Sequence, residues 1–275
     1  MSLRINTNVS SLGVQRALSQ NQRATERTTL NVATGSRISD PSADVASTAI
    51  AAQMKSQLAS LGAAKQNADS AGDISSIAEG SLSEQSNILN RMRELALQSA
   101  SDTFTDTERA MMQKEFSEIS DESDRIAKTT KYGDRNLLDG STNKFEFQVG
   151  TTAGAESRIS TTVEANTTSS ELNIDSASVA SKSDARSAIT DIDKGLQSVN
   201  LQRASFAATQ SRLESASNSL GSNIENLSKA RSQVADADLA KEISDLRREQ
   251  VLQQYQATIL QQVNDQPNLA LRLIA

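Results

Sequence analysis

A hydrophobic repeat with alternating spacings of three and four residues runs through the C-terminal part of the sequence without losing phase. It begins at Ile189 and ends at Val234, and ten of its fourteen positions are apolar. Such a repeat is typical of one helix that packs along a seam against others, and at about 1.5 Å per residue this helix is roughly 70 Å long. Ser183 and Asp184 stand where an N-cap is expected. The length predicts a rod or a bundle rather than a compact globule.

The N-terminal half contains shorter seams with the same spacing, one over residues 78–99 and one over residues 112–126. Thr105 and Glu108 lie between them with the spacing of a capping box, in which two side chains satisfy backbone groups at a helix start. We therefore predict two further helices that pack with the long one, and we interpret the seams as the core of a helical bundle.

Composition agrees with thin helices and argues against most catalytic sites. Aromatic residues make up 3% of the chain, which has no Trp, Cys or His. A chain without these residues lacks the largest core-filling rings, thiolate metal ligands and the commonest general base. The net charge of −6 argues against binding to nucleic acid. We therefore expect no enzyme activity, no cofactor and no metal, although an enzyme could still use Asp, Glu, Ser, Lys or Tyr.

The helical pattern stops in the middle of the chain. Apolar residues alternate with polar ones from Phe145 to Val149, which predicts a small β-hairpin over about residues 141–160. Seventeen of the 47 residues in 141–187 are Ser or Thr. We expect a short, variable and exposed connection over about residues 155–182. The Ser/Thr-rich region 141–187 is either an ordinary exposed loop or an acceptor of O-linked sugars.

The two chain ends are weakly patterned. Residues 1–44 and 236–275 are predicted to form one unit of paired terminal helices, and residues 45–235 a second unit with the bundle and hairpin. Helices with so little apolar periodicity are unstable alone, so we expect them to order by packing on each other and on neighbouring copies. The residues expected to make these contacts are Ile5, Val9, Leu12, Leu239, Ile243, Leu246, Leu252, Tyr255 and Ile259.

Nothing in the sequence predicts a membrane span or a cleaved secretory signal. The first twelve residues have no apolar core, and no run of 18 apolar residues occurs anywhere. We expect no membrane insertion. Composition leaves two locations open, the cytoplasm and the outside of the cell after export without a cleaved signal.

Several longer motifs point to one family. They are RINTN at 4–8, NRMRELALQSA at 90–100, NLLDG at 136–140, FQVG at 147–150, SRLE at 211–214, NIENL at 223–227 and ADADLA at 235–240. In these stretches, and in their order, the chain resembles bacterial flagellin, the subunit of the flagellar filament. The resemblance covers nearly the whole chain except about residues 155–180.

The resemblance implies a mainly α fold, a long antiparallel helical bundle with one small β-hairpin and without large outer domains. It implies a protein that is exported unfolded by the flagellar type III apparatus and polymerises into an extracellular filament for motility. The terminal helices would fold on assembly, pair antiparallel and line the central channel. The implied partners are other copies of the chain, hook-associated and cap proteins, and a flagellar export chaperone.

Three residues match positions with known roles in the family. Arg91, Leu95 and Glu115 stand where many flagellins are bound by the innate immune receptor for flagellin. The same surface contacts adjacent subunits in filaments, so subunit contact is the simpler interpretation.

A stretch with eight acidic and two basic residues, 102–124, could be imagined as a metal site, but a solvated helix face explains it better.

Three other functions fit the sequence less well. A hook-associated junction protein shares the terminal helices but usually matches the motifs at 91–100 and 223–240 less well. A cytoplasmic coiled-coil scaffold would explain the repeats but neither the hairpin nor the apolar-ended termini. An enzyme has no support from a nucleophile–base pair, a phosphate loop or a ligand cluster.

Overall fold

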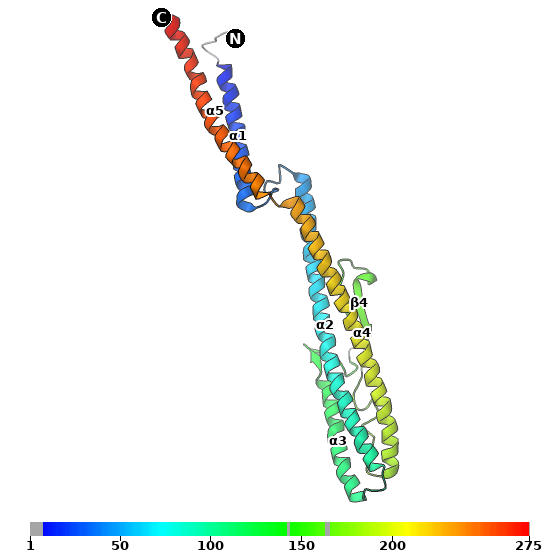
Figure 1. Cartoon of the computed structure of the whole chain (residues 1–275). Helices are drawn as coiled ribbons and strands as arrows, with labels where there is room; N and C mark the ends of the chain where they lie inside the picture. The colour runs from blue at the N-terminus through cyan, green and yellow to red at the C-terminus, as the bar shows by residue number, and fades with distance from the viewer. Residues whose placement is uncertain (1–7, 142–143, 163–165, 275) are drawn as a thin grey trace. The chain divides into compact units, whose positions relative to one another are not determined.

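The computed structural model describes residues 8–141, 144–162 and 166–274. Contacts divide the chain into a terminal unit, made of residues up to Leu58 and from Glu225 onward, and a bundle unit, residues Ala59–Ile224. The predicted mainly helical fold is confirmed (Figure 1). The long helices of the described residues are α1 (Val9–Thr34), α2 (Val45–Ser99), α3 (Asp106–Thr129), α4 (Lys182–Ala235) and α5 (Leu239–Ile274).

The long apolar repeat lies on one helix, as predicted. α4 runs for 54 residues without interruption. Of its repeat positions, Ile192, Val199, Phe206 and Leu213 are buried in the bundle unit. Straight-chain and branched aliphatic residues at this spacing bury one stripe of the helix and leave the rest to solvent.

The second and third helices supply the other walls of the bundle. Leu82, Leu89 and Met92 of α2 and Phe116 of α3 are completely or almost completely buried in the same hydrophobic cluster as the α4 stripe. Between α2 and α3 the predicted capping box is present: the Thr105 hydroxyl accepts from the Glu108 N–H, and the Glu108 carboxylate accepts from the Thr105 N–H.

The predicted hairpin is also present. β3 (Lys144–Gln148) pairs antiparallel with β4 (Arg158–Thr162). Ile159 and Phe147 pack with Ala71 of α2 and Leu213 of α4, so the hairpin covers a second hydrophobic cluster of the bundle unit. A further short pair, β1 (Lys131–Tyr132) with β2 (Arg135–Asn136), flanks a turn at Gly133, whose φ is +60°.

The connection expected to be exposed over residues 155–182 is partly buried, and that expectation was wrong for its second half. Leu172, Ile174 and Val179 belong to the main hydrophobic cluster. Their spacing matches neither a helix nor a strand, and Ser and Thr residues surround them, so the sequence did not predict their burial. Ile174 is only 1% exposed, because the segment folds onto the bundle instead of forming a free loop.

In the terminal unit, two short segments between helices pair with each other. Gly35 ends α1 with a φ of +65°, a left-handed conformation that suits glycine because it has no Cβ. Its carbonyl accepts from the Ala237 N–H at 2.9 Å, and the Arg37 N–H donates to the Ala235 carbonyl at 2.8 Å. These bonds join the segment before α2 to the segment before α5.

Candidate functional site

Several hydrogen bonds from polar side chains join α1 to α5. The Asn8 amide donates to the Val263 carbonyl at 2.9 Å, and the Asn21 amide donates to the Glu249 carbonyl at 2.8 Å. The Ser11 hydroxyl donates to Asn264 Oδ1 at 2.8 Å. The described buried residues of α1 are Ser11, Thr28 and Asn31, none of them apolar.

The predicted apolar contacts do not lie in this seam. The chain-end residues Val9, Leu12, Leu239, Ile243, Leu252, Tyr255 and Ile259 are all exposed, and Leu246 is half-buried. Val9 and Tyr255 are each 65% exposed. Within the single chain these side chains are therefore not buried between the two helices, and their packing on neighbouring copies stays a prediction. Ile5, the remaining predicted contact, lies outside the described residues.

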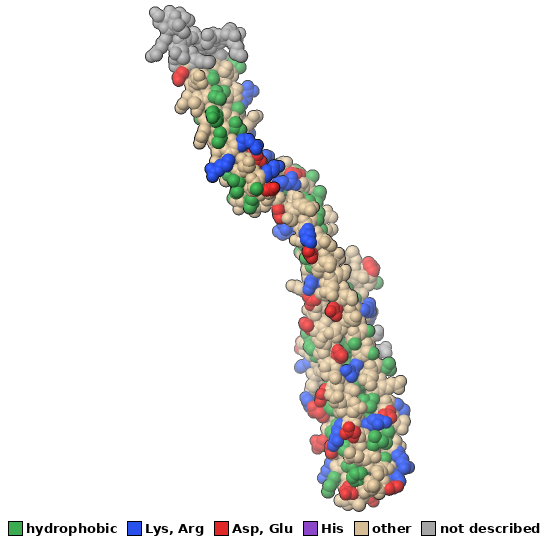
Figure 2. All heavy atoms as spheres, in the orientation of Figure 1, with side chains coloured by type: hydrophobic (Ala, Val, Ile, Leu, Met, Phe, Trp, Pro, Cys, Tyr) green, Lys and Arg blue, Asp and Glu red, His purple; other side chains and the backbone are tan. Residues whose placement is uncertain are grey.

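Apolar side chains consequently reach the surface of the terminal unit, where Figure 2 shows them among polar atoms. Leu30 and Val251 are also exposed. By contrast, the buried apolar residues described in this unit are Ala51 and Ala235 alone. Large apolar side chains gathered at a surface indicate an interaction site.

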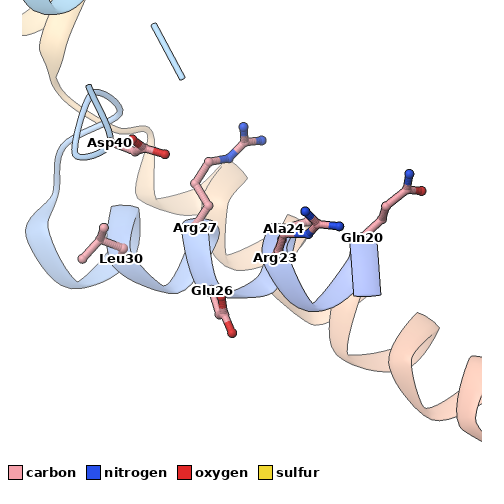
Figure 3. A pocket seen from close by; sticks show the side chains of 7 residues that line it. All are labelled: Gln20, Arg23, Ala24, Glu26, Arg27, Leu30 and Asp40. Carbon is pink, nitrogen blue, oxygen red and sulfur yellow. The ribbon is translucent and has the colours of Figure 1, made fainter. Parts of the chain in front are cut away.

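The hollows on α1 are open and have mixed character. One, of about 590 Å³, is lined by Arg23, Arg27, Leu30 and Asp40 among others (Figure 3). Asp40 accepts hydrogen bonds from the Ser42 hydroxyl and N–H, and these bonds lower the pKa of its carboxyl. A carboxylate held ionised in a loop cap is a poor general base.

Arg91 and Glu115 are brought together in the bundle unit. Arg91 Nη2 donates to Glu115 Oε1 at 2.6 Å, and Arg91 Nη1 donates to Glu94 Oε2 at 3.1 Å. The bonds to Glu115 and then Glu94 raise the pKa of Arg91. All three side chains are about half exposed, so the pairs contribute little stability but leave a charged patch that joins α2 to α3.

Leu95 does not lie on that patch. Its side chain is 1% exposed and belongs to the main hydrophobic cluster. The position falls on the buried stripe of α2, so Leu95 packs the bundle core and offers no accessible side chain for a partner.

No acid cluster of the kind that holds a metal occurs among the described residues. The acidic stretch around α3 brings no three carboxylates together there. Asp124, one of its members, instead accepts from the Ser169 N–H at 3.2 Å and pairs with Lys128. Within the same residues no helix is long and apolar enough to cross a membrane.

Sequence reasoning missed the polar residues that carry these contacts. Asn8, Ser11 and Asn21 were not singled out, because a search for apolar periodicity passes over them. Gln85 is another case: it is completely buried, and its amide donates to the Ser123 and Thr167 carbonyls at 3.0 and 3.2 Å. The sequence could have indicated them as Asn or Gln residues at otherwise apolar helix-packing positions. Such residues often determine how helices align.

Two family models match the chain. The model of the bacterial flagellin N-terminal helical region matches residues 5–143, and that of the bacterial flagellin C-terminal helical region matches residues 189–274. Both matches fall on the helices described above, and residues 144–188 lie between them.

Individual proteins match over nearly the full length. The chain is 32% identical to a flagellin of Halalkalibacterium halodurans over 275 residues, covering 98% of this chain and 99% of the relative. It is 32% identical to the flagellar filament 30.7 kDa core protein of Treponema maltophilum over 286 residues, covering 98% and 99%. The crystal structure of Bacillus cereus flagellin, 27% identical, superposes with a TM-score of 0.51 over 56% of this chain and 88% of that one.

Proposed function

Because the chain belongs to the bacterial flagellin family and is a structural subunit of a flagellar filament, we propose that its terminal unit joins each subunit to the next. The observation that carries this proposal is that nine large apolar side chains of α1 and α5 are exposed, while hydrogen bonds from polar residues join the two helices.

Burial of those side chains between copies would drive polymerisation. Removing apolar surface from water contributes about 25 cal/mol for each Å². Nine large apolar residues described on α1 and α5 are exposed: Val9, Leu12, Leu30, Leu239, Ile243, Val251, Leu252, Tyr255 and Ile259. A second copy with the same stripe is the partner of matching chemistry.

The family supports a layered assembly with folding coupled to it. We propose that residues 1–44 and 236–275 form the inner layer around a channel and residues 45–235 the layer outside it. With no large apolar side chain described as buried, the terminal unit has little to stabilise it alone, so its helices would become ordered on assembly. From the family we also propose unfolded export through the flagellar type III apparatus and an extracellular location.

Further contacts are proposed at the filament ends and on the bundle unit. Hook-associated proteins, the cap and an export chaperone would meet the terminal helices. Arg91 and Glu115 would face an adjacent subunit, with Leu95 beneath them as packing. The innate immune receptor for flagellin would use the same patch on free chains. No step in this function requires catalysis or a cofactor.

Seeded growth tests the proposal. Chains dissociated by heat and mixed with filament fragments should elongate them, whereas a hook-associated junction protein should not elongate on its own. Tyr255→Ser combined with Ile259→Ser should slow elongation at least about tenfold, because the loss of roughly 1.4 kcal/mol of burial is enough for that factor. Gln254→Ser, exposed on the same helix, is the matched control. Normal growth of the double variant would refute the proposal.

A further inference from the structure

One side of α5 is already occupied by α1. Half-buried residues recur along it at steps of three and four, the spacing of a helix that packs along one side. Hydrogen bonds from α1 reach the same side, at the Glu249 and Val263 carbonyls. The residues that mark this α1-facing side are Glu242, Leu246, Glu249, Gln253, Gln256, Leu260 and Val263.

Exposed apolar residues of α5 lie on both flanks of the α1-facing side. Because each residue turns an α-helix by about 100°, Ile243 lies roughly 100° from the middle of that side in one direction. Ile259 lies roughly 90° from it in the other direction, and Tyr255 lies roughly 130° away on the same flank as Ile259. We call Leu239 and Ile243 the Ile243 flank, and Leu252, Tyr255 and Ile259 the Tyr255 flank. All five side chains are between 44% and 65% exposed.

One neighbouring helix cannot cover both flanks. They are about half a turn apart round α5. α1 lies between them on one side of the helix, and the exposed Arg247 lies between them on the other. Packed helices have their axes about 8–10 Å apart, so a straight helix laid against one flank does not reach the other. Burial of all five side chains therefore needs two separate contacts.

We propose that the Ile243 flank and the Tyr255 flank of α5 bind two different copies of the chain, one that joined the filament earlier and one that joins later. This proposal deepens the proposed function and rests on it. An interface in which both copies use the same surface closes into a pair, whereas an interface between two different surfaces continues from copy to copy and builds a filament. Two apolar flanks that face away from each other meet the second requirement.

The two flanks therefore act at different moments of growth. At a given filament end, an arriving chain uses one flank to bind the copies already there, and its other flank stays free until the next chain arrives. A chain altered on the first flank cannot join that end. A chain altered on the second flank joins and then blocks the next addition.

Two double variants separate these moments. Leu239→Ser with Ile243→Ser alters the Ile243 flank, and Tyr255→Ser with Ile259→Ser alters the Tyr255 flank. Loss of two apolar side chains should weaken one contact more than about tenfold. Gln250→Ser with Gln254→Ser is the control, because both residues are exposed on the same helix and neither is apolar. The two altered chains carry different fluorescent labels and are mixed together, with an excess of native chain, onto filament fragments.

We expect each filament end to accept only one of the two altered chains, which is then found at the tip, and native growth at that end to fall at least about fivefold. The control chain should be incorporated along the whole length without slowing growth. Ends that accept both altered chains, or neither, would overturn the proposal, because the two flanks would then serve the same step. The proposed function would stand in the case of neither. If the native chain does not elongate the fragments at all, the proposed function fails instead.

Discussion

At the scale of single residues, buried amides and hydroxyls decide how irregular segments attach to the bundle. Gln85 joins α3 to the connection through the Ser123 and Thr167 carbonyls. Gln113 accepts from the Val179 N–H at 2.6 Å, and Ser99 donates to the Val179 carbonyl at 2.5 Å. Buried polar backbone groups need such partners, so these side chains make burial of the connection possible.

Gln85→Leu should destabilise the bundle by about 2 kcal/mol, because two buried carbonyls lose a donor while the volume of the side chain is nearly kept. Urea unfolding followed by circular dichroism measures the change. Gln98→Leu, on the exposed face of α2, should alter the stability by no more than about 0.5 kcal/mol. Equal stability of the two variants would show that the Gln85 amide does not anchor the segment.

At the scale of elements, helix length comes from the apolar repeat and helix boundaries come from caps. α4 continues for 54 residues because its apolar repeat never loses phase and no Pro interrupts it. α3 begins at Asp106 because the Thr105 and Glu108 side chains satisfy backbone groups that the first turn leaves free. Buried Arg109 then donates to the Ser101 and Phe104 carbonyls at 2.8 and 3.1 Å, which fixes the turn before the helix.

Thr105→Ala should lower the free energy of unfolding by about 1 kcal/mol at neutral pH, as expected for loss of an N-cap. Thr107→Ala is the control, since this threonine is exposed in the first turn and caps nothing in the described structure. Thermal unfolding of the bundle compares the two. A larger loss from Thr107→Ala would contradict the capping assignment.

The same cap should respond to pH. Hydrogen bonds from the Thr105 N–H and hydroxyl lower the pKa of Glu108. A lowered folded-state pKa means that the stabilisation is present above the ordinary pKa of a glutamate and is lost as pH falls through the lowered value. Glu108→Gln cannot titrate, so its stability should fall less than that of the native chain across this acidic range. Parallel pH profiles would contradict the prediction.

At the scale of the whole molecule, the described apolar core belongs to one of the two units. All members of the hydrophobic clusters lie between Ala71 and Leu213, inside the bundle unit. In the terminal unit the large apolar side chains that the structure describes are at least partly exposed. We therefore expect the bundle to be stable by itself and the terminal unit to need contacts with other copies of the chain.

A chain trimmed to residues 45–235 should remain soluble and helical and should unfold cooperatively in urea, because it keeps every cluster residue. It should not elongate filament fragments, because it lacks α1 and α5. Circular dichroism and light scattering after seeding measure the two properties. If the trimmed chain grew normal filaments, the subunit contacts would lie outside α1 and α5. If both ends of the isolated full chain resisted proteolysis, folding on assembly would be contradicted.

Periodic features were predictable from the sequence because they are local. The seam on α4, the capping box at Thr105 and the strand alternation from Phe145 all follow from fixed backbone geometry, and the structure contains each of them. The motifs also identified the family without any knowledge of contacts.

Only the tertiary structure decided which side of each weak helix is covered. Val9 and Tyr255 are apolar in sequence yet point to solvent, whereas Leu95 was assigned to a surface and is buried. Leu172 is buried without any periodic signal. The physical reason is that local geometry determines the spacing of side chains along an element. Which side of an element is covered depends on contacts between residues far apart in the sequence, such as the Asn8–Val263 and Gln85–Thr167 hydrogen bonds, which exist only once the chain has folded.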